Sequence, residues 1–375
     1  MKFISLQENL KRGLTIVGHA TTKNINLPIL NNILIRAEGG NIELISTNLE
    51  IGVRHQLRGK IETEGEFTVD SKLITEYVSL LTSSETVKLE EKEGELKVES
   101  GNYKTKIKGE SAKEFPLIPT LESENNFYCD LNEMKKALAS VIFAVSNSEN
   151  RAELTGVLFS FKEKKLSLAA TDSYRLAERE IVLKSGTGSD EQKIIVPAKT
   201  VQGLLRILNN FDNHQEIESA NEIIISFSEN QILFKFDSVS LISRLINGRY
   251  PDYQQIIPSK SQTQAAVDKN ELTRAIKAVS LFSKTGINDI TLLFLKGKVS
   301  VSAFSGASGE SQADILAEVD GVDNEITINY RYLLDGLNNI DGSQALIKVL
   351  NNNTPCLIRS KEKEDYLYIV MPIKQ

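Results

Sequence analysis

The chain has 375 residues and a formal net charge of −6 at pH 7, from 44 Lys and Arg against 50 Asp and Glu. With 41% hydrophobic and 25% charged residues, the composition is that of a folded globular protein and excludes an intrinsically disordered one. The acidic total argues against a protein whose whole surface binds nucleic acid, although it leaves room for a local basic surface. At about 150 residues per domain, the length predicts two or three domains.

Targeting signals and redox-active cysteines are not indicated by the sequence. Only Cys129 and Cys356 are present, which argues against a disulfide framework or a Cys-rich zinc site. Glu8, Lys11 and Arg12 interrupt any apolar core of a signal peptide, and no apolar run reaches the roughly 18 residues of a membrane span. We therefore expect a cytoplasmic protein with no membrane partner.

One amphipathic helix pattern recurs three times, at residues 7–17, 131–141 and 269–279. Apolar side chains at positions i, i+4 and i+7 form one face of each helix, and the three sets are Leu10, Leu14 and Val17; Met134, Leu138 and Val141; and Leu272, Ile276 and Val279. Asp130 and Asp268, each followed three residues later by Glu, predict capping boxes for the second and third copies. The matching Ser5 and Glu8 of the first copy are displaced by one position.

A second helix pattern follows each copy of the first, after residues 69–72, 196–199 and 328–331. Pro197 suits the first turn of the middle copy, and Gly336 stands where the third apolar stripe expects a larger residue. Because two separate segments recur at about the same interval, the chain is interpreted as three tandem repeats of about 125 residues.

Short β-branched or alternating runs fill the rest of each repeat and predict strands. These are residues 33–37, 42–46, 86–89, 96–99, 157–161, 166–170, 223–227, 232–236, 240–245, 292–295, 299–303, 346–350 and 366–371. The predicted fold class is therefore α+β, with two helices packed on antiparallel sheets in each repeat. Pro-containing segments at 115–119 and 250–258 set the expected domains at 1–122, 123–254 and 255–375.

Basic residues occupy matching positions in the repeated helices. In the first helix they lie two residues after the first stripe residue, about 200° around the helix and so opposite the core; in the second helix they lie just before the stripe. The two sets are Arg12, Lys136 and Arg274, and Lys72, Lys199 and Arg331. An ordinary solvated helix face is one interpretation. The threefold matching favours a shared basic surface for duplex phosphates, read without regard to base sequence.

No catalytic or metal-binding motif stands out. His19, His55 and His214 have no spacing that groups them, and the motifs of zinc proteases, P-loops and serine hydrolases are missing. Asp172 after Thr171 is interpreted as a turn-capping residue in preference to a catalytic one. We expect no enzymatic activity, no cofactor and no metal.

Five segments, in matching order over essentially the whole chain, resemble the bacterial DNA polymerase III β subunits, the replicative sliding clamps. They are residues 26–32 (NLPILNN), 170–176 (ATDSYRL), 196–199 (VPAK), 248–253 (GRYPDY) and 368–374 (YIVMPIK). The resemblance implies three clamp domains per chain, forming half of a closed six-domain ring. It also implies that a head-to-tail homodimer encircles double-stranded DNA and acts as a processivity factor. Partners would be the polymerase III catalytic subunit and clamp-loader subunits, through short peptide motifs.

The resemblance also implies a partner-peptide groove between the second and third domains. Its positions in this chain are Leu154, Thr171, Ser173, Tyr174, Arg175, Leu176, Pro251, Gln255, Ile256, Ile369, Val370, Met371, Pro372 and Ile373. Tyr174, Gln255 and the terminal Gln375 depart from the residues often found in the family. Aliphatic anchors of a short peptide would fill such a trough, and Met suits several partners.

The DNA-contacting positions implied by the resemblance are Lys72, Lys199 and Lys260, with Lys23 and Arg151 in support. Two aromatic residues that touch DNA in some family members correspond here to Ala152 and Glu153. Two other functions stay open at this point: a peptide-binding scaffold without a DNA role, and an enzyme built on a repeated β-rich scaffold.

Overall fold

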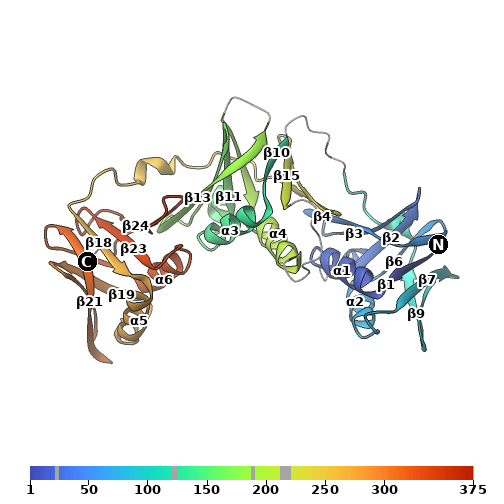
Figure 1. Ribbon diagram of the computed structural model, residues 1–375, viewed down its shortest axis with the longest axis horizontal. Helices are drawn as coiled ribbons and strands as arrows, with labels where there is room; N and C mark the ends of the chain where they lie inside the picture. Colours follow the sequence, from blue (N-terminus) through green and yellow to red (C-terminus); the bar gives the residue numbers. More distant parts are fainter. Residues whose placement is uncertain (22–24, 120, 122–125, 187–190, 212–220, 375) are drawn as a thin grey trace. The chain divides into compact units, whose positions relative to one another are not determined.

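The computed structural model describes residues 1–21, 25–119, 121, 126–186, 191–211 and 221–374 (Figure 1). The first repeat holds β1 (Lys2–Leu6), α1 (Gln7–Gly18), η1 (Pro28–Asn31), β2 (Asn32–Glu38), β3 (Asn41–Thr47), β4 (Ile51–Leu57), β5 (Lys60–Thr63), β6 (Gly65–Asp70), α2 (Ser71–Ser79), β7 (Thr86–Lys92), β8 (Glu95–Ser100), β9 (Tyr103–Glu110) and η2 (Ala112–Glu114).

The second and third repeats follow the same order of α-helices and strands, except that a single long strand stands in place of β4 and β5. The second holds β10 (Asn126–Asp130), α3 (Leu131–Ile142), η3 (Glu149–Thr155), β11 (Gly156–Lys162), β12 (Lys165–Thr171), β13 (Arg175–Gly186), β14 (Gln192–Pro197), α4 (Ala198–Phe211), β15 (Glu222–Phe227), β16 (Gln231–Phe236), β17 (Val239–Arg244) and η4 (Tyr253–Ile256). The third holds β18 (Thr263–Asp268), α5 (Lys269–Val279), η5 (Ser280–Phe282), β19 (Asp289–Leu295), β20 (Lys298–Ser305), β21 (Gly309–Gly321), β22 (Asn324–Asn329), α6 (Tyr330–Asn338), β23 (Gln344–Val349), β24 (Cys356–Ser360) and β25 (Tyr366–Val370). The predicted threefold α+β organisation is confirmed.

Side-chain caps begin α3 and α5 at the two aspartates that the sequence predicts. The carboxylate of Asp268 accepts the Glu271 backbone N–H at 2.8 Å, and that of Asp130 accepts the Glu133 N–H at 3.1 Å. α1 begins after Leu6 with no side-chain cap, in line with the displaced motif of the first copy. A cap of this kind satisfies a backbone donor that the helix itself leaves unpaired, which fixes the first residue of the helix.

The predicted apolar stripes form the cores. Leu10, Leu14 and Val17 of α1 and Ile74 and Val78 of α2 are all fully buried. Figure 1 shows α1 and α2 side by side, and α1 packs on β2, β3 and β4. α5 and α6 form the equivalent pair of the third repeat.

Gly336 explains the gap in the third apolar stripe. A Cβ atom at this position would lie 2.1 Å from the ring of Tyr368, so only glycine lets the ring pack directly on the α6 backbone. Tyr368 is fully buried, and its hydroxyl donates to the Tyr332 carbonyl at 2.8 Å. The glycine therefore allows α6 and β25 to pack closely.

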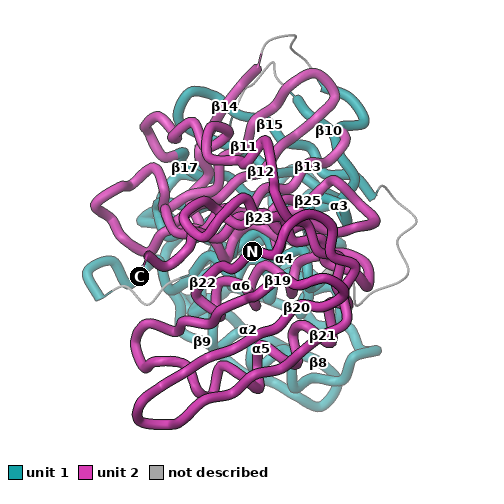
Figure 2. Tube along the Cα trace, turned by 90° about the vertical axis from the view of Figure 1, so that its left-hand side faces the viewer, with its two compact units in different colours: residues 1–135, 183–189, 199–245 teal, residues 136–182, 190–198, 246–375 magenta. Residues whose placement is uncertain are grey.

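The chain divides into two compact units, coloured separately in Figure 2. Unit 1 comprises residues 1–135, 183–189 and 199–245, and unit 2 comprises residues 136–182, 190–198 and 246–375. In unit 1, β4 pairs antiparallel with β17, from Ile51 opposite Ser243 to His55 opposite Val239. In unit 2, β13 pairs antiparallel with β25, from Arg175 opposite Val370 to Arg179 opposite Tyr366. Each pairing joins strands of two consecutive repeats.

Candidate functional site

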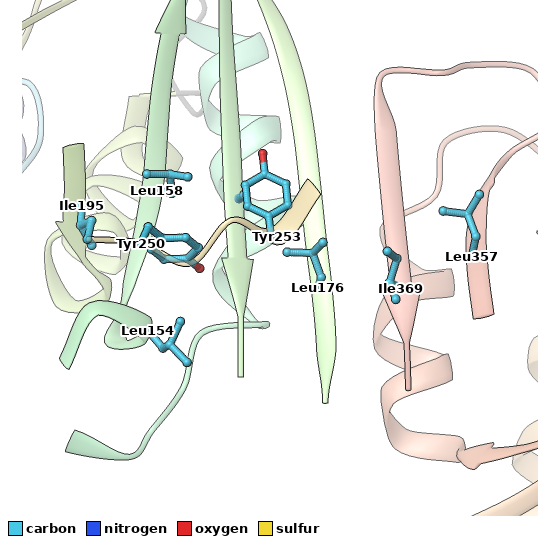
Figure 3. Packing of buried hydrophobic residues seen from close by; sticks show 9 residues of the cluster. Leu154, Leu158, Leu176, Ile195, Tyr250, Tyr253, Leu357 and Ile369 are labelled. Carbon is cyan, nitrogen blue, oxygen red and sulfur yellow. The ribbon is translucent and has the colours of Figure 1, made fainter. Parts of the chain in front are cut away.

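An apolar cluster in unit 2 brings together part of the predicted groove (Figure 3). It contains three of the predicted groove residues, Leu154, Leu176 and Ile369. The other members are not among the predicted groove residues: Leu158, Ala169, Ile195, Tyr250, Tyr253 and Leu357. Leu176 on β13 stands opposite Ile369 on β25, so the cluster extends across the strand pairing of the second and third repeats. The members are at most 8% exposed, so they form the floor of the region and not its surface.

A tight turn before β13 carries Thr171, Asp172 and Ser173. The Asp172 carboxylate accepts the backbone N–H groups of Tyr174 and Arg175 at 2.9 and 3.0 Å. Ser173 adopts a φ of 77°, a left-handed conformation that such turns require. The predicted turn-capping role of Asp172 is confirmed. The turn presents the side chain of Tyr174, which is 64% exposed.

The Arg175 guanidinium ties this turn to α3 and α6. It donates to the Asp172 carboxylate at 2.9 Å, to Asp335 of α6 at 2.5 Å and to the Phe143 carbonyl at 2.7 Å. It also stacks on the Tyr332 ring, with 4.6 Å between Cζ and the ring centroid. The Arg175 side chain is 12% exposed, and its bonds hold the turn in position.

The C-terminal segment is anchored by backbone hydrogen bonds. The Met371 N–H donates to the Tyr174 carbonyl at 2.9 Å, and the Ile373 N–H donates to the Thr327 carbonyl at 2.8 Å. Pro372 forms an isolated bridge with Ile328. Met371, Pro372 and Ile373 remain half-buried, so their apolar surfaces are available beside Tyr174.

The remaining predicted groove residues lie on or next to η4. Ile256 is 41% exposed, and Pro251 is half-buried. The Gln255 amide donates to the Asp252 carboxylate at 2.9 Å. The region thus combines a buried apolar floor with half-buried or exposed apolar side chains, and its polar rim includes Gln255.

A cavity of about 890 Å³ lies next to the cluster in unit 2. It shares Leu158, Ile195, Tyr250 and Tyr253 with the cluster, but Pro251 alone among the predicted groove residues lines it. The ion pairs Lys165–Glu180 and Lys193–Glu191, at 2.7 and 3.1 Å, also line the cavity. Burial raises the pKa of the Tyr250 and Tyr253 phenols above the ordinary value, so both stay protonated. The sequence signal for both tyrosines is the GRYPDY segment.

Most of the predicted DNA-contacting cations are exposed. The Lys72 and Lys199 side chains are 73% and 79% exposed and lie 3.7 and 3.8 Å from Glu76 and Glu50. Such solvated pairs contribute little to stability, so both ammonium groups remain available to other anions. The other exposed cations are Lys260, Arg274, Arg331 and Arg151, the last paired with Glu153 at 3.0 Å. Lys23 lies outside the described residues.

Arg12 and Lys136 differ from the expectation of a solvent-facing helix side. The Arg12 side chain is 18% exposed and its guanidinium lies 3.7 Å from Asp237. The Lys136 ammonium lies 2.5 Å from Asp341. Each acid belongs to the repeat that follows the cation's own, so a neighbouring repeat places a carboxylate against the helix face that the isolated helix would expose, although the Lys136 side chain stays 39% exposed. Helix periodicity carries no information on that neighbour.

Both described histidines contact a polar side chain, and both cysteines are buried. His19 and His55 contact Asn210 at 2.9 Å and Ser238 at 3.3 Å respectively, and His214 lies outside the described residues. Burial raises the pKa of the Cys129 and Cys356 thiols to about 12. Among the described residues, no group of His, Cys, Asp and Glu is placed to hold a metal ion. In the same part of the chain, none of the helices has the length and hydrophobicity that a bilayer crossing demands.

Comparison with known proteins matches nearly the whole chain to one family. Models of the DNA polymerase III beta subunit match in order: the N-terminal domain at residues 1–119, the central domain at 129–252 and the C-terminal domain at 254–374. The beta sliding clamp of Synechococcus elongatus is 27% identical over 379 residues, covering 100% of this chain and 99% of the relative.

Two solved structures illustrate the similarity in three dimensions. The DNA polymerase sliding clamp of Bacillus subtilis is 26% identical with a TM-score of 0.92, over 100% of this chain and 99% of that one. The sliding clamp of Bartonella birtlesii, solved bound to griselimycin, is 27% identical with a TM-score of 0.91, over 100% of both chains.

Proposed function

Because the chain belongs to the DNA polymerase III beta subunit family, we propose that it is a replicative sliding clamp of the bacterial cytoplasm. Two copies join head to tail into a closed ring of six repeats around duplex DNA, and the ring tethers the replicative polymerase to its template. A tether raises the effective concentration of the polymerase without any chemical step, so the protein itself is non-catalytic.

One observation carries the ring: both junctions between repeats use the same pair of strands. β4, β13 and β21 hold the same place in their repeats, as do β9, β17 and β25. Within the chain, β4 pairs with β17 and β13 pairs with β25. By the same rule β21 should pair with β9. Among the described residues of one chain these two strands make no such pairing, so β21 of one copy would pair with β9 of another. A head-to-tail contact forms a closed ring when the rotation from one copy to the next adds up to a full turn. Repeats that are joined in the same way at every junction favour such a ring.

The edges of β9 and β21 support this pairing. Lys104, Lys106 and Lys108 project from β9, whereas Glu310 and Asp314 project from β21, and all five are exposed. Opposite charges steer two copies together and disfavour pairing of like edges. Large apolar side chains lie exposed on or beside the strands: Tyr103 at 55% on β9, Leu316 at 84% on β21 and Leu281 at 76% on η5.

The register of the pairing follows from the two junctions inside the chain. Counting along the corresponding ladders of each repeat places Gly309 opposite Ile107 and Ala313 opposite Tyr103. Lys106 then stands opposite Glu310, and Lys104 opposite Gln312. Antiparallel residues that stand opposite each other have Cα atoms about 4.5–5.5 Å apart, within the range of a disulfide.

Phosphate contact is assigned to the exposed cations Lys72, Lys199, Lys260, Arg331 and Arg151, with Lys23. Their charges suit a backbone contact that is independent of base sequence and weak enough to permit sliding.

Partner peptides are assigned to the region around the apolar cluster. Tyr174, Ile256, Met371, Pro372 and Ile373 offer half-buried or exposed apolar surface over a buried floor. A short peptide of the polymerase catalytic subunit or of a clamp-loader subunit would place its apolar anchors there. The Bartonella birtlesii clamp with bound griselimycin supports the view that this fold accepts a ligand.

A designed cross-link tests the ring directly. The double variant Lys104→Cys with Gln312→Cys, mixed with nicked circular DNA and then oxidised, should give a covalent dimer of twice the 41.7 kDa chain mass. That dimer should remain on the circle in high salt and leave when the DNA is cut, because only topology holds it. Lys97→Cys with Gln312→Cys, which places one cysteine on interior strand β8, is the matched control and should not cross-link.

Two results would count against the proposal. A wild-type chain that stays monomeric in light scattering would exclude the ring. Equal retention on circular and cut DNA would favour a peptide-binding scaffold without a DNA role.

A further inference from the structure

We propose that the cation repeated at Arg12, Lys136 and Arg274 stabilises each junction between repeats through an ion pair, called a lock below. Arg274 would form the third lock with Glu85 of a second copy. This inference rests on the proposed ring, and it assigns to these three residues a role other than DNA contact.

The first lock lies in unit 1, where the first and second repeats meet. Arg12 projects from α1, and Asp237 lies in the turn between β16 and β17. β17 is the strand that pairs with β4, so the ion pair stands beside that strand pairing. The two side chains are 18% and 25% exposed, and their closest atoms are 3.7 Å apart. A pair shielded to this degree contributes more than one on the open surface.

The second lock lies in unit 2, where the second and third repeats meet. Lys136 projects from α3 at the position equivalent to Arg12, and its ammonium contacts Asp341, in the connection between α6 and β23. Arg179 of β13, 1% exposed, contacts Asp341 at 2.9 Å and Asp365 at 2.8 Å. Asp365 immediately precedes β25, the strand that pairs with β13. Again, a first-helix cation meets an acid from the second half of the next repeat.

The third position has its cation, Arg274, on the last of the three repeats. Arg274 projects from α5 and is exposed, and among the described residues it has no ion-pair partner. In the proposed ring, the repeat that follows the third is the first repeat of another copy, so the acid for Arg274 comes from that copy. The two locks above specify where that acid should stand: beside the turn between β8 and β9, or in the connection between α2 and β7.

Glu85 satisfies both conditions. It lies in the connection between α2 and β7, as Asp341 lies between α6 and β23. Its carboxylate accepts a hydrogen bond from Ser100 at 3.2 Å, at the turn between β8 and β9. Gly101 of that turn is the counterpart of Asp237, and a Cβ atom there would lie 2.5 Å from the Glu85 carboxylate. Glu85 therefore places a carboxylate beside the turn where Gly101, unlike its counterpart Asp237, has no charged side chain.

A charge-swap cycle on the full chain tests the third lock. Arg274→Glu and Glu85→Arg should each raise the dimer dissociation constant about tenfold or more, measured by sedimentation equilibrium at low salt. The double variant should return it to within about threefold of wild type, which general damage to folding would not do. Lys296→Glu, an exposed residue in the turn between β19 and β20, makes the same charge change as a matched control and should leave the constant unchanged.

A DNA measurement separates the lock from phosphate contact. In the covalent Lys104→Cys with Gln312→Cys ring, Arg274→Ala should leave the salt dependence of DNA contact unchanged, since the ring stays closed. A reduced slope would make Arg274 a DNA residue and overturn the inference. Single variants that dimerise as wild type does, or a double variant that is not restored, would overturn it while the ring itself stood. A monomeric wild type would instead refute the proposed function.

Discussion

At the residue scale, the junction of the first two repeats contains a histidine that cannot take up a proton easily. Burial, with the nearby Arg12 charge, lowers the pKa of His55 from 6.5 to about 4, although Asp237 partly opposes the shift. The unfolded chain therefore binds a proton between pH 6.5 and pH 4 that the folded chain does not bind. Folding stability should then fall as the pH is lowered through this window.

We expect this single site to contribute roughly 2–4 kcal/mol of the loss in unfolding free energy between pH 7 and pH 4. Urea unfolding of wild type and His55→Gln across that range measures it. The variant should lose distinctly less stability with acid than wild type does. Two parallel profiles would mean that His55 titrates normally in the folded chain.

At the element scale, the helices, their apolar faces and most strands could be predicted because each depends on local periodicity and caps. The α5 stripe and the Asp268 cap follow directly from residues close together in sequence. The strand pairings β4 with β17 and β13 with β25 could not be predicted, because they join residues far apart in sequence. For the same reason periodicity assigned Arg12 to solvent, whereas Asp237 of the next repeat covers it.

Gly336 shows how one element constrains another. Gly336→Ala would place a methyl group against the Tyr368 ring and force β25 and α6 apart. We expect a loss of about 1–3 kcal/mol in unfolding free energy by urea titration. Gly203→Ala in α4 is the matched control, because a Cβ there meets nothing within 4 Å. That variant should gain about 0.5–1 kcal/mol from helix propensity, and equal effects at both positions would contradict the packing argument.

At the scale of the whole molecule, the net charge of −6 does not give the charge of any one surface, so it does not decide whether the protein binds DNA. The acidic total includes carboxylates committed to junctions, such as Asp237 and Asp341. The exposed Lys72 and Lys199 are each paired with an exposed glutamate, Glu76 and Glu50 respectively. In the candidate site, the groove residues could be predicted only from the family resemblance. The GRYPDY segment marks Tyr250 and Tyr253, but their place in this cluster needed the fold, because the sequence around a buried residue does not reveal which core it joins.

Lys72→Ala and Lys199→Ala should each reduce the slope of log affinity against log salt by about 0.9 for every phosphate that the variant no longer neutralises. The measurement is retention of the cross-linked ring on duplex DNA over a salt series, with Lys296→Ala as the control. An unchanged slope for both lysines would remove them from the DNA-contacting set.

The strand pairings between repeats also bear on how far such a sequence can drift. Backbone amides and carbonyls make those joints, and they are the same whichever side chains the strands carry. Substitutions can therefore accumulate along β4, β13, β17 and β25 provided that the buried faces stay apolar. The chain shares 26% of its residues with the Bacillus subtilis clamp and yet superimposes with a TM-score of 0.92. Architecture joined by main chain can thus outlast most of the sequence that first encoded it.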